Sequence, residues 1–186
     1  MTPPIDFSKP NNNSDRVFVI EGKHLHVNSQ VLGVFSTFFD RLFNGEFSDA
    51  AKEVIPLDGI NYEEFVELLQ TIYPSQNSIR VGNVESLLAL SDRFDIPSVF
   101  IKCEQFLLNS PDVNKIDLFL RLDWASRYCM PELQNHLLLS LTTMDAICKA
   151  SESPAWRNMC EAAKTGLLLT VFRVHKGPNA MPPHFF

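Results

Sequence analysis

Strand-like patterns lie mostly in the first third of this chain, and helical spacing of apolar residues dominates the remainder. Residues 16–20 are rich in β-forming side chains, residues 24–27 alternate polar with apolar, and residues 21–23 between them are typical of a turn. A third short run, residues 54–57, contains Pro56, which favours an edge strand because proline donates no ladder hydrogen bond. The sequence therefore predicts a small sheet that begins with a hairpin.

Helical spacing first appears over residues 29–43, with a break near Ser36 that divides the stretch into two helices. Asn61 is placed to cap a helix over residues 62–73, and residues 79–81 are predicted as a short strand. The rest is helical to about residue 172, with interruptions at four prolines: Pro97, Pro111, Pro131 and Pro154.

The helical part contains a weak internal repeat with a period of 34 residues, in which residues 91–99 align with residues 125–133. Each copy has a helix that ends at an aromatic residue, a tight turn with an apolar residue, and a proline that opens the next helix. Two copies do not establish a solenoid, and chance similarity between two helical hairpins is the alternative. We expect stacked helical hairpins.

The charge and the apolar pattern argue against nucleic acid and membranes as partners. The net charge is −6, and the basic groups nearest to a cluster, at residues 23–26, are sparse and lie beside Glu21. The apolar stretch at residues 166–172 is too short to cross a bilayer, and residues 1–14 lack the pattern of a signal peptide. We expect a soluble protein of the cytoplasm, the nucleus or both.

No catalytic or metal-binding constellation is visible in the sequence. The four cysteines lie far apart without a CxxC pair, which predicts reduced thiols in a reducing compartment and not a zinc site. No Gly-x-Ser-x-Gly motif and no glycine-rich phosphate loop occurs, and the seven glycines are not clustered. We expect no enzymatic activity, no cofactor and no metal.

An ordered set of short motifs runs through residues 15–110 with regular gaps between them. The motifs are Asp15-x-Val17-x-Val19, Leu25, Val31-Leu32, Ser36-x-x-Phe39-x-x-Leu42-Phe43, Phe47-Ser48-Asp49, Ile55-x-Leu57-Asp58, Phe65-x-x-Leu68-Leu69-x-x-Ile72-Tyr73, Leu87-Leu88-x-Leu90-Ser91-Asp92-x-Phe94-x-Ile96, Cys103 and Phe106. Together they resemble a BTB/POZ domain. The sequence departs from the family at Asn28, where many members have His, and at Ser91, where Ala is usual.

The resemblance implies an α+β BTB/POZ fold, in which a small, mostly antiparallel sheet lies against a cluster of helices and is followed by helical hairpins. Residues 111–173 resemble the start of the helical BACK extension of some family members. We expect a flexible N-terminal tail at 1–14, the BTB/POZ domain at 15–110, the BACK-like extension at 111–173 and a C-terminal tail at 174–186.

The resemblance also implies a surface that binds cullin-3. BTB proteins that recruit cullin-3 carry a hydrophobic-x-acidic motif after the third family helix, and Phe47 and Asp49 match it. Judged without the family, Phe47 folds onto the core and Asp49 is a solvated loop charge. Tyr73, at the end of the following helix, is a further candidate for this surface, and an equally good candidate for the core.

A second surface implied by the resemblance is dimeric. Family members commonly pair through the first helix and hairpin, and the apolar residues there exceed what one core-facing stripe needs. The alternative is a helix buried inside the domain. The predicted dimer residues are Asp15, Val31, Val34, Phe35, Phe38 and Phe39.

In the extension, the leucines at 137–141 and the Met and aromatic residues Phe119, Trp124, Tyr128, Met130 and Trp156 are predicted to be core, with a protein-binding groove as the alternative. The resemblance implies an adaptor that dimerises, binds cullin-3 and brings an unknown protein substrate to a RING ubiquitin ligase. A self-association scaffold without cullin binding, homomeric or paired with other BTB proteins, is the main rival. An enzyme would need a deep polar pocket with perturbed ionisable groups.

Overall fold

The computed structural model describes residues 5–45 and 52–176 of the 186-residue chain. The chain divides into two compact units, Met1–Cys103 and Glu104–Phe186. The division falls within helix α5 (Pro97–Asn109), close to the predicted end of the BTB/POZ part. Each unit is described by itself.

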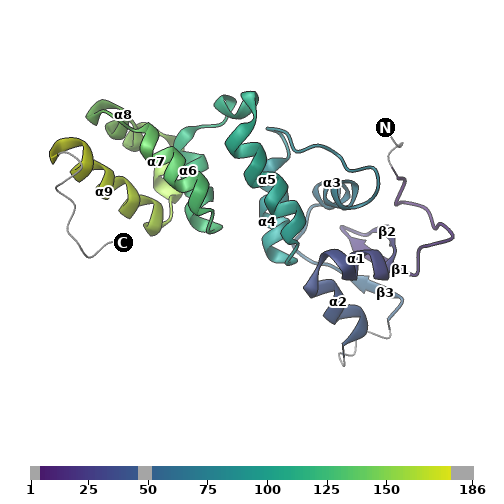
Figure 1. Cartoon of the computed structure of the whole chain (residues 1–186). Helices are drawn as coiled ribbons and strands as arrows, with labels where there is room; N and C mark the ends of the chain where they lie inside the picture. The colour runs from purple at the N-terminus through teal and green to yellow at the C-terminus, as the bar shows by residue number, and fades with distance from the viewer. Residues whose placement is uncertain (1–4, 46–51, 177–186) are drawn as a thin grey trace. The chain divides into compact units, whose positions relative to one another are not determined.

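The first unit contains a three-stranded sheet of order β2-β1-β3 (Figure 1). β1 (Arg16–Ile20) pairs antiparallel with β2 (Lys23–Val27) and parallel with β3 (Val54–Pro56). The turn of the hairpin places Glu21 and Gly22 at φ 51° and 74°, as a two-residue hairpin turn requires. The predicted hairpin and the edge position of Pro56 are confirmed. The parallel pairing of β3 follows from the helical crossover that precedes it.

The first unit also contains helices. They are α1 (Ser29–Phe35), α2 (Thr37–Asn44), α3 (Tyr62–Ile72), α4 (Val84–Arg93) and the first part of α5. Of these, α1 and α2 lie beside the sheet in Figure 1. The predicted break at Ser36 is confirmed, because Ser36 is extended and caps both helices. Its hydroxyl accepts a hydrogen bond from Phe39 N and donates one to Phe94 O. Asn61 caps α3 as predicted.

Four phenylalanine side chains without appreciable exposure form the centre of the first unit: Phe18, Phe39, Phe65 and Phe94. The ring of Phe39 stacks on that of Phe94 at 5.0 Å and lies 5.4 Å from that of Phe18. Because aromatic rings bury large apolar areas, this cluster joins the sheet to α2, α3 and α4.

Two expectations for the first unit are wrong. Residues 79–81, predicted as a strand, form a loop whose backbone is held by the buried side chain of Asn83, which accepts from Arg80 N at 2.7 Å and donates to Ser78 O at 3.3 Å. The expected tail at 1–14 is attached to the body within its described part, because the ring of Phe7 is buried and Phe7 O accepts a hydrogen bond from His26 N.

The second unit is helical. Its elements are η1 (Pro111–Lys115), α6 (Leu118–Arg127), α7 (Pro131–Ser140), α8 (Met144–Cys148), η2 (Lys149–Glu152), η3 (Pro154–Asn158) and α9 (Glu161–Lys176). α6 packs against α7 and α9, and its core residues include Leu122 and Ala125, which are fully buried. The α+β class, with a small sheet followed by helices, is confirmed.

The turns predicted from the internal repeat are equivalent. In the first, Asp95 has a φ of 47° and Ile96 N donates to Ser91 O at 2.9 Å. In the second, Cys129 has a φ of 53° and Met130 N donates to Ala125 O at 2.7 Å. Both are helix ends closed by a left-handed residue and followed by a proline that opens the next helix.

Candidate protein-interaction surface

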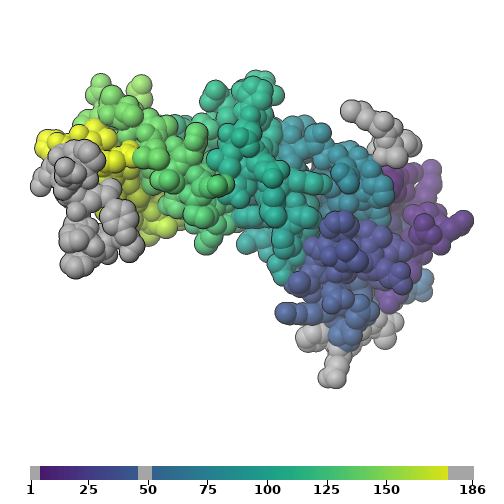
Figure 2. Space-filling view, in the orientation of Figure 1, coloured from purple at the N-terminus to yellow at the C-terminus, as the bar shows by residue number. Residues whose placement is uncertain are grey.

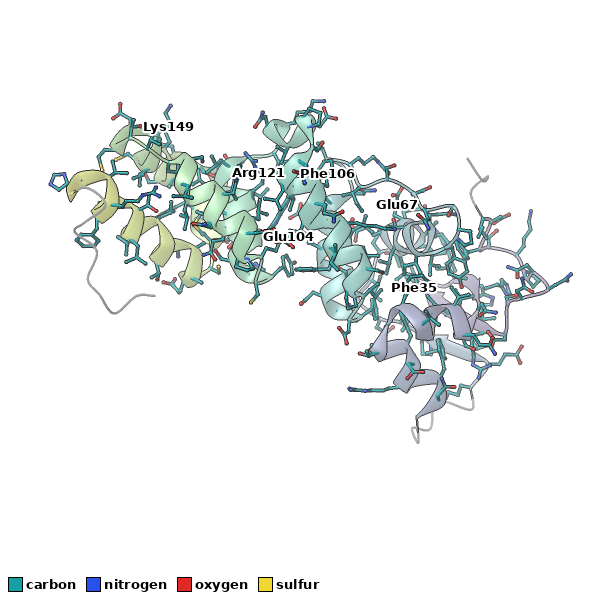
Figure 3. The ribbon with its side chains drawn as sticks, in the orientation of Figure 1. Phe35, Glu67, Glu104, Phe106, Arg121 and Lys149 are labelled. Atoms are coloured by element: carbon teal, nitrogen blue, oxygen red, sulfur yellow. The ribbon has the colours of Figure 1, made fainter. Side chains whose placement is uncertain are left out.

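Helix α1 and the start of α2 present apolar side chains to solvent. Val34 is 82% exposed and Phe38 is 40% exposed, while Val31 and Phe35 are partly exposed. Figure 3 labels Phe35 on α1, and Figure 2 shows α1 and α2, in indigo, on the surface of the first unit. Exposed apolar side chains that gather on one face are typical of a protein-interaction surface. Together, Val31, Val34, Phe35 and Phe38 are called the α1 face.

Phe39 does not belong to the α1 face, although it was predicted with it. Its side chain is 0% exposed and lies in the aromatic cluster. Both Phe38 and Phe39 lie on α2, which Ser36 separates from α1. The ring of Phe38 meets those of Phe39 and Phe94 and remains 40% exposed, whereas Phe39 is fully buried.

The residues of the α1 face are themselves uncharged, but carboxylates border the helices that carry it: Asp15 binds Ser29, Asp95 binds Thr37, and Asp40 lies beside Gly33. No Asp, Glu, Lys or Arg lies between Val27 and Phe39 in a chain with a net charge of −6. A cavity of about 920 Å³ adjoins the face, and its walls are mostly amide and apolar side chains. It is lined by Ile5, Asn11, Asn12, Asn13, His26, Asn28, Gln30, Val31, Val34, Tyr73 and Pro74. The four apolar side chains of this face can themselves be buried against a second copy without burying a formal charge.

Asp15 positions the start of α1. Its carboxylate accepts hydrogen bonds from Ser29 N at 2.7 Å and from Ser29 Oγ at 2.5 Å. Burial acts to raise the pKa of Asp15, but the hydrogen bonds from Ser29 and the charge of Arg16 outweigh it and lower the pKa. Asn28 accepts from Val31 N as the N-cap of the same helix. An Asn directly before an apolar helical pattern is the signal that identifies this cap.

Tyr73 lies in the core and not on a surface. Its side chain is 8% exposed, its ring meets that of Phe7 edge to face at 4.9 Å, and its hydroxyl accepts from Asn28 N at 2.9 Å. Burial raises the pKa of Tyr73 to about 12, so its hydroxyl is neutral. The other two residues predicted for cullin-3 binding, Phe47 and Asp49, lie outside the described residues.

The second unit buries most of its predicted core. Phe119, Trp124 and Met130 are buried, whereas Tyr128 is intermediate and Trp156 is 36% exposed. Of the leucines at 137–141, Leu139 is 55% exposed. On α9, Leu168 and Phe172 are also exposed.

The part of the chain that the structure describes offers no group of three or more His, Cys, Asp or Glu side chains that could hold a metal ion. Within the same residues, none of the helices combines the length and the apolar character that a membrane span requires.

Comparison with known proteins identifies the family. The model of the BTB/POZ domain matches residues 5–111. BTB and MATH domain-containing protein 36 of Caenorhabditis elegans is 36% identical over 155 residues, which are 83% of this chain and 48% of that protein. BTB and MATH domain-containing protein 38 of the same organism is 32% identical over 92% of this chain and 44% of its own length. Kelch-like protein 22 of Mus musculus is 24% identical over 75% of this chain and 22% of its own length.

Among solved structures, the BTB domain of human gigaxonin is similar at a TM-score of 0.44 and 21% identity, over 51% of this chain and 78% of that one. The chain spans about half the length of the two worm relatives. The family match covers more than half of the chain and includes both the α1 face and the strands behind it. BTB domains are non-catalytic interaction modules, and this chain belongs to the BTB/POZ domain family.

Proposed function

We propose that this chain is a dimeric adaptor that brings a protein substrate to a cullin-3 RING ubiquitin ligase. The observation that supports dimerisation is the α1 face, on which Val34 is 82% exposed within a stretch free of formal charge. Burial of such a face against a second copy removes apolar surface from water.

The proposed cullin-3 contact rests on family membership and on the sequence at residues 47–49. There, an aromatic side chain and a carboxylate are two residues apart, which suits an apolar anchor with a charge that selects the partner. Tyr73 is not part of the proposed contact, because its side chain is buried and its hydroxyl accepts a hydrogen bond from Asn28 N. The four free cysteines fit the reducing conditions of the cytoplasm or the nucleus, where we place the protein.

The test is binding of the purified chain to the N-terminal domain of cullin-3, with molar mass measured by light scattering. We expect the wild type to bind as a dimer and Phe47→Ala/Asp49→Lys to lose binding while its fold and mass stay intact. Phe172→Ala/Asp145→Lys is the matched control, because it makes the same two changes at exposed positions of the second unit.

The outcomes separate this proposal from its rival. A folded wild-type dimer that does not bind cullin-3 would contradict the ligase adaptor and leave the self-association scaffold. Equal binding by wild type and double mutant would move the cullin-3 contact away from residues 47–49. A folded monomer would remove the dimer surface from both schemes.

A further inference from the structure

The described start of the chain, residues 5–13, is held on the first unit by contacts typical of peptide recognition. Gln70, which is 6% exposed, binds the backbone of Ile5 at both polar groups. Its Oε1 accepts from Ile5 N at 3.3 Å and its Nε2 donates to Ile5 O at 2.5 Å. Two residues further, Phe7 O accepts from His26 N at 2.8 Å, at the outer edge of β2. This stretch, residues 5–13, is called the N-terminal segment.

The first unit contacts the N-terminal segment through the backbone of Ile5 and Phe7 and through the ring of Phe7. Phe7 is 3% exposed, and its ring packs edge to face on that of Tyr73. The charged side chains of the segment do not contribute to this binding, because Asp6 pairs with Lys9 at 3.4 Å and accepts from Ser8. The segment makes one main-chain hydrogen bond at the sheet edge and buries one side chain, and both kinds of contact occur in strand-addition recognition.

Little of the N-terminal segment is buried: Phe7 is its one buried residue, and Asn13 O accepts a hydrogen bond from Asn28 Nδ2. Residues 8–13 are exposed and connect residues 5–7 to β1. If the segment left, it would expose the side-chain amide of Gln70, the edge of β2 at His26 and the ring of Tyr73. The 920 Å³ cavity, which His26, Tyr73 and Ile5 line, would adjoin these groups. Segments joined by exposed linkers and few buried side chains open at low free energy.

We propose that Gln70, His26 and Tyr73 form a peptide-binding site that the N-terminal segment occupies in cis. Its ligand in trans is an extended segment of a partner protein with an aromatic residue at the position of Phe7, two residues after the backbone groups that Gln70 binds. The N-terminal segment competes with this ligand and so sets the concentration at which the partner binds. The site does not depend on cullin-3 binding.

The test measures binding of a fluorescein-labelled peptide with the sequence of residues 2–10 by fluorescence anisotropy. Phe7→Ala empties the aromatic pocket and should bind this peptide at least about 10-fold more tightly than the wild type, because the competing segment no longer fills the site. Gln70→Ala added to Phe7→Ala should abolish the gain. The matched controls are Phe172→Ala, which should bind like the wild type, and a peptide in which the phenylalanine is alanine, which should not bind.

A second form of the experiment does not depend on how Phe7→Ala folds. A protease site is inserted after Pro10, in the exposed linker, and the cut chain is passed over a sizing column. The released segment should separate from the folded body and rebind when it is added back as the labelled peptide.

Failure of the peptide to bind either the folded Phe7→Ala chain or the cut body would overturn the proposal. Equal binding of the peptide and its alanine version would do the same. A doubling of wild-type mass that Phe7→Ala abolishes would show exchange of the segment between two copies, and would also overturn occupation in cis.

Discussion

The side chain of Phe7 is buried within a stretch of prolines, asparagines and exposed polar residues. We expect Phe7→Ala to lower the free energy of unfolding by about 1.5–3 kcal/mol, the value of burying one such side chain. The segment can detach, so the cavity that makes core substitutions costlier does not persist. Phe39→Ala, in the aromatic cluster, should cost about 3–5 kcal/mol.

Urea unfolding of the two variants beside the wild type measures this difference. An effect of Phe7→Ala as large as that of Phe39→Ala would contradict a detachable segment. It would instead place residues 5–7 within the cooperative core of the first unit.

Asp15 makes the stability of the fold depend on pH. Because its pKa is lower in the folded chain than the ordinary 3.8, ionised Asp15 stabilises the fold above the unfolded pKa, and this contribution is lost as pH falls through the folded pKa. We therefore expect Asp15→Asn to be less stable than the wild type near neutral pH, and the difference to shrink below about pH 4. The effect is modest, because the side chain is 43% exposed.

Urea unfolding at several pH values, with the exposed Asp145→Asn as control, tests this dependence. If Asp15→Asn loses the same stability at every pH, the ionised carboxylate is not what holds Ser29 at the start of α1.

The residue-scale predictions from sequence succeeded where a local rule decides the outcome and failed where a distant contact does. Asn61 and Ser36 act on backbone groups within three residues; Asn61 was predicted as a cap, and Ser36 was predicted only as the place of a helix break. The burial of Phe7 depends on Tyr73, far along the chain, and no periodic pattern of apolar residues around Phe7 predicts it. Phe39 was predicted for the dimer surface, but its side chain is fully buried and its ring stacks on that of Phe94.

At the scale of elements, the repeated helix–turn–helix was predictable because prolines and apolar spacing specify it locally. What the sequence did not show is that the turns use Asp95 and Cys129, rather than glycine, at positive φ. A side chain in this conformation costs about 1–2 kcal/mol, which glycine avoids at an entropic cost of about 0.5–1 kcal/mol. We expect Cys129→Gly to stabilise the chain by about 0.5–1 kcal/mol.

Thermal unfolding of Cys129→Gly beside Cys148→Gly tests this prediction. Both cysteines are exposed, but Cys148 lies within α8, where glycine should destabilise by about 0.5–1 kcal/mol. Cys129→Val should also destabilise, since a branched side chain fits this backbone poorly. Equal effects of the two glycine substitutions would contradict a strained turn at Cys129.

The wrongly predicted strand at 79–81 shows the limit of element prediction from pattern. Glu67, on α3 (Figure 3), binds the guanidinium of Arg80 through both carboxylate oxygens, at 2.7 and 3.0 Å, and accepts from Asn83 at 3.0 Å. The hydrogen bonds from Arg80 lower the pKa of Glu67 and keep it ionised. The short alternation of apolar residues at 79–81 therefore does not lead to a strand, because side chains form hydrogen bonds with the loop backbone in place of a neighbouring strand.

At the scale of the whole molecule, the order and spacing of the motifs indicated the BTB/POZ family, although no single motif was specific enough to do so. The interaction surfaces could not be derived in the same way. A stripe of apolar residues at helical spacing is compatible with core and with interface alike, and only the exposures of Val34 and Phe39, 82% and 0%, separate the two.

The exposure of Val34 leads us to expect that the chain dimerises. We expect wild-type chains to form a dimer of twice the 21.1 kDa chain mass and Val34→Asp to be monomeric in light scattering. A carboxylate at Val34 would be buried without a partner in a symmetric interface, which costs several times the apolar contact it replaces. Leu168→Asp is the control, because Leu168 is 62% exposed on α9 and outside the α1 face. A dimer that survives Val34→Asp but dissociates with Leu168→Asp would move the interface to the second unit, and the uncharged stretch from Val27 to Phe39 would then need another partner.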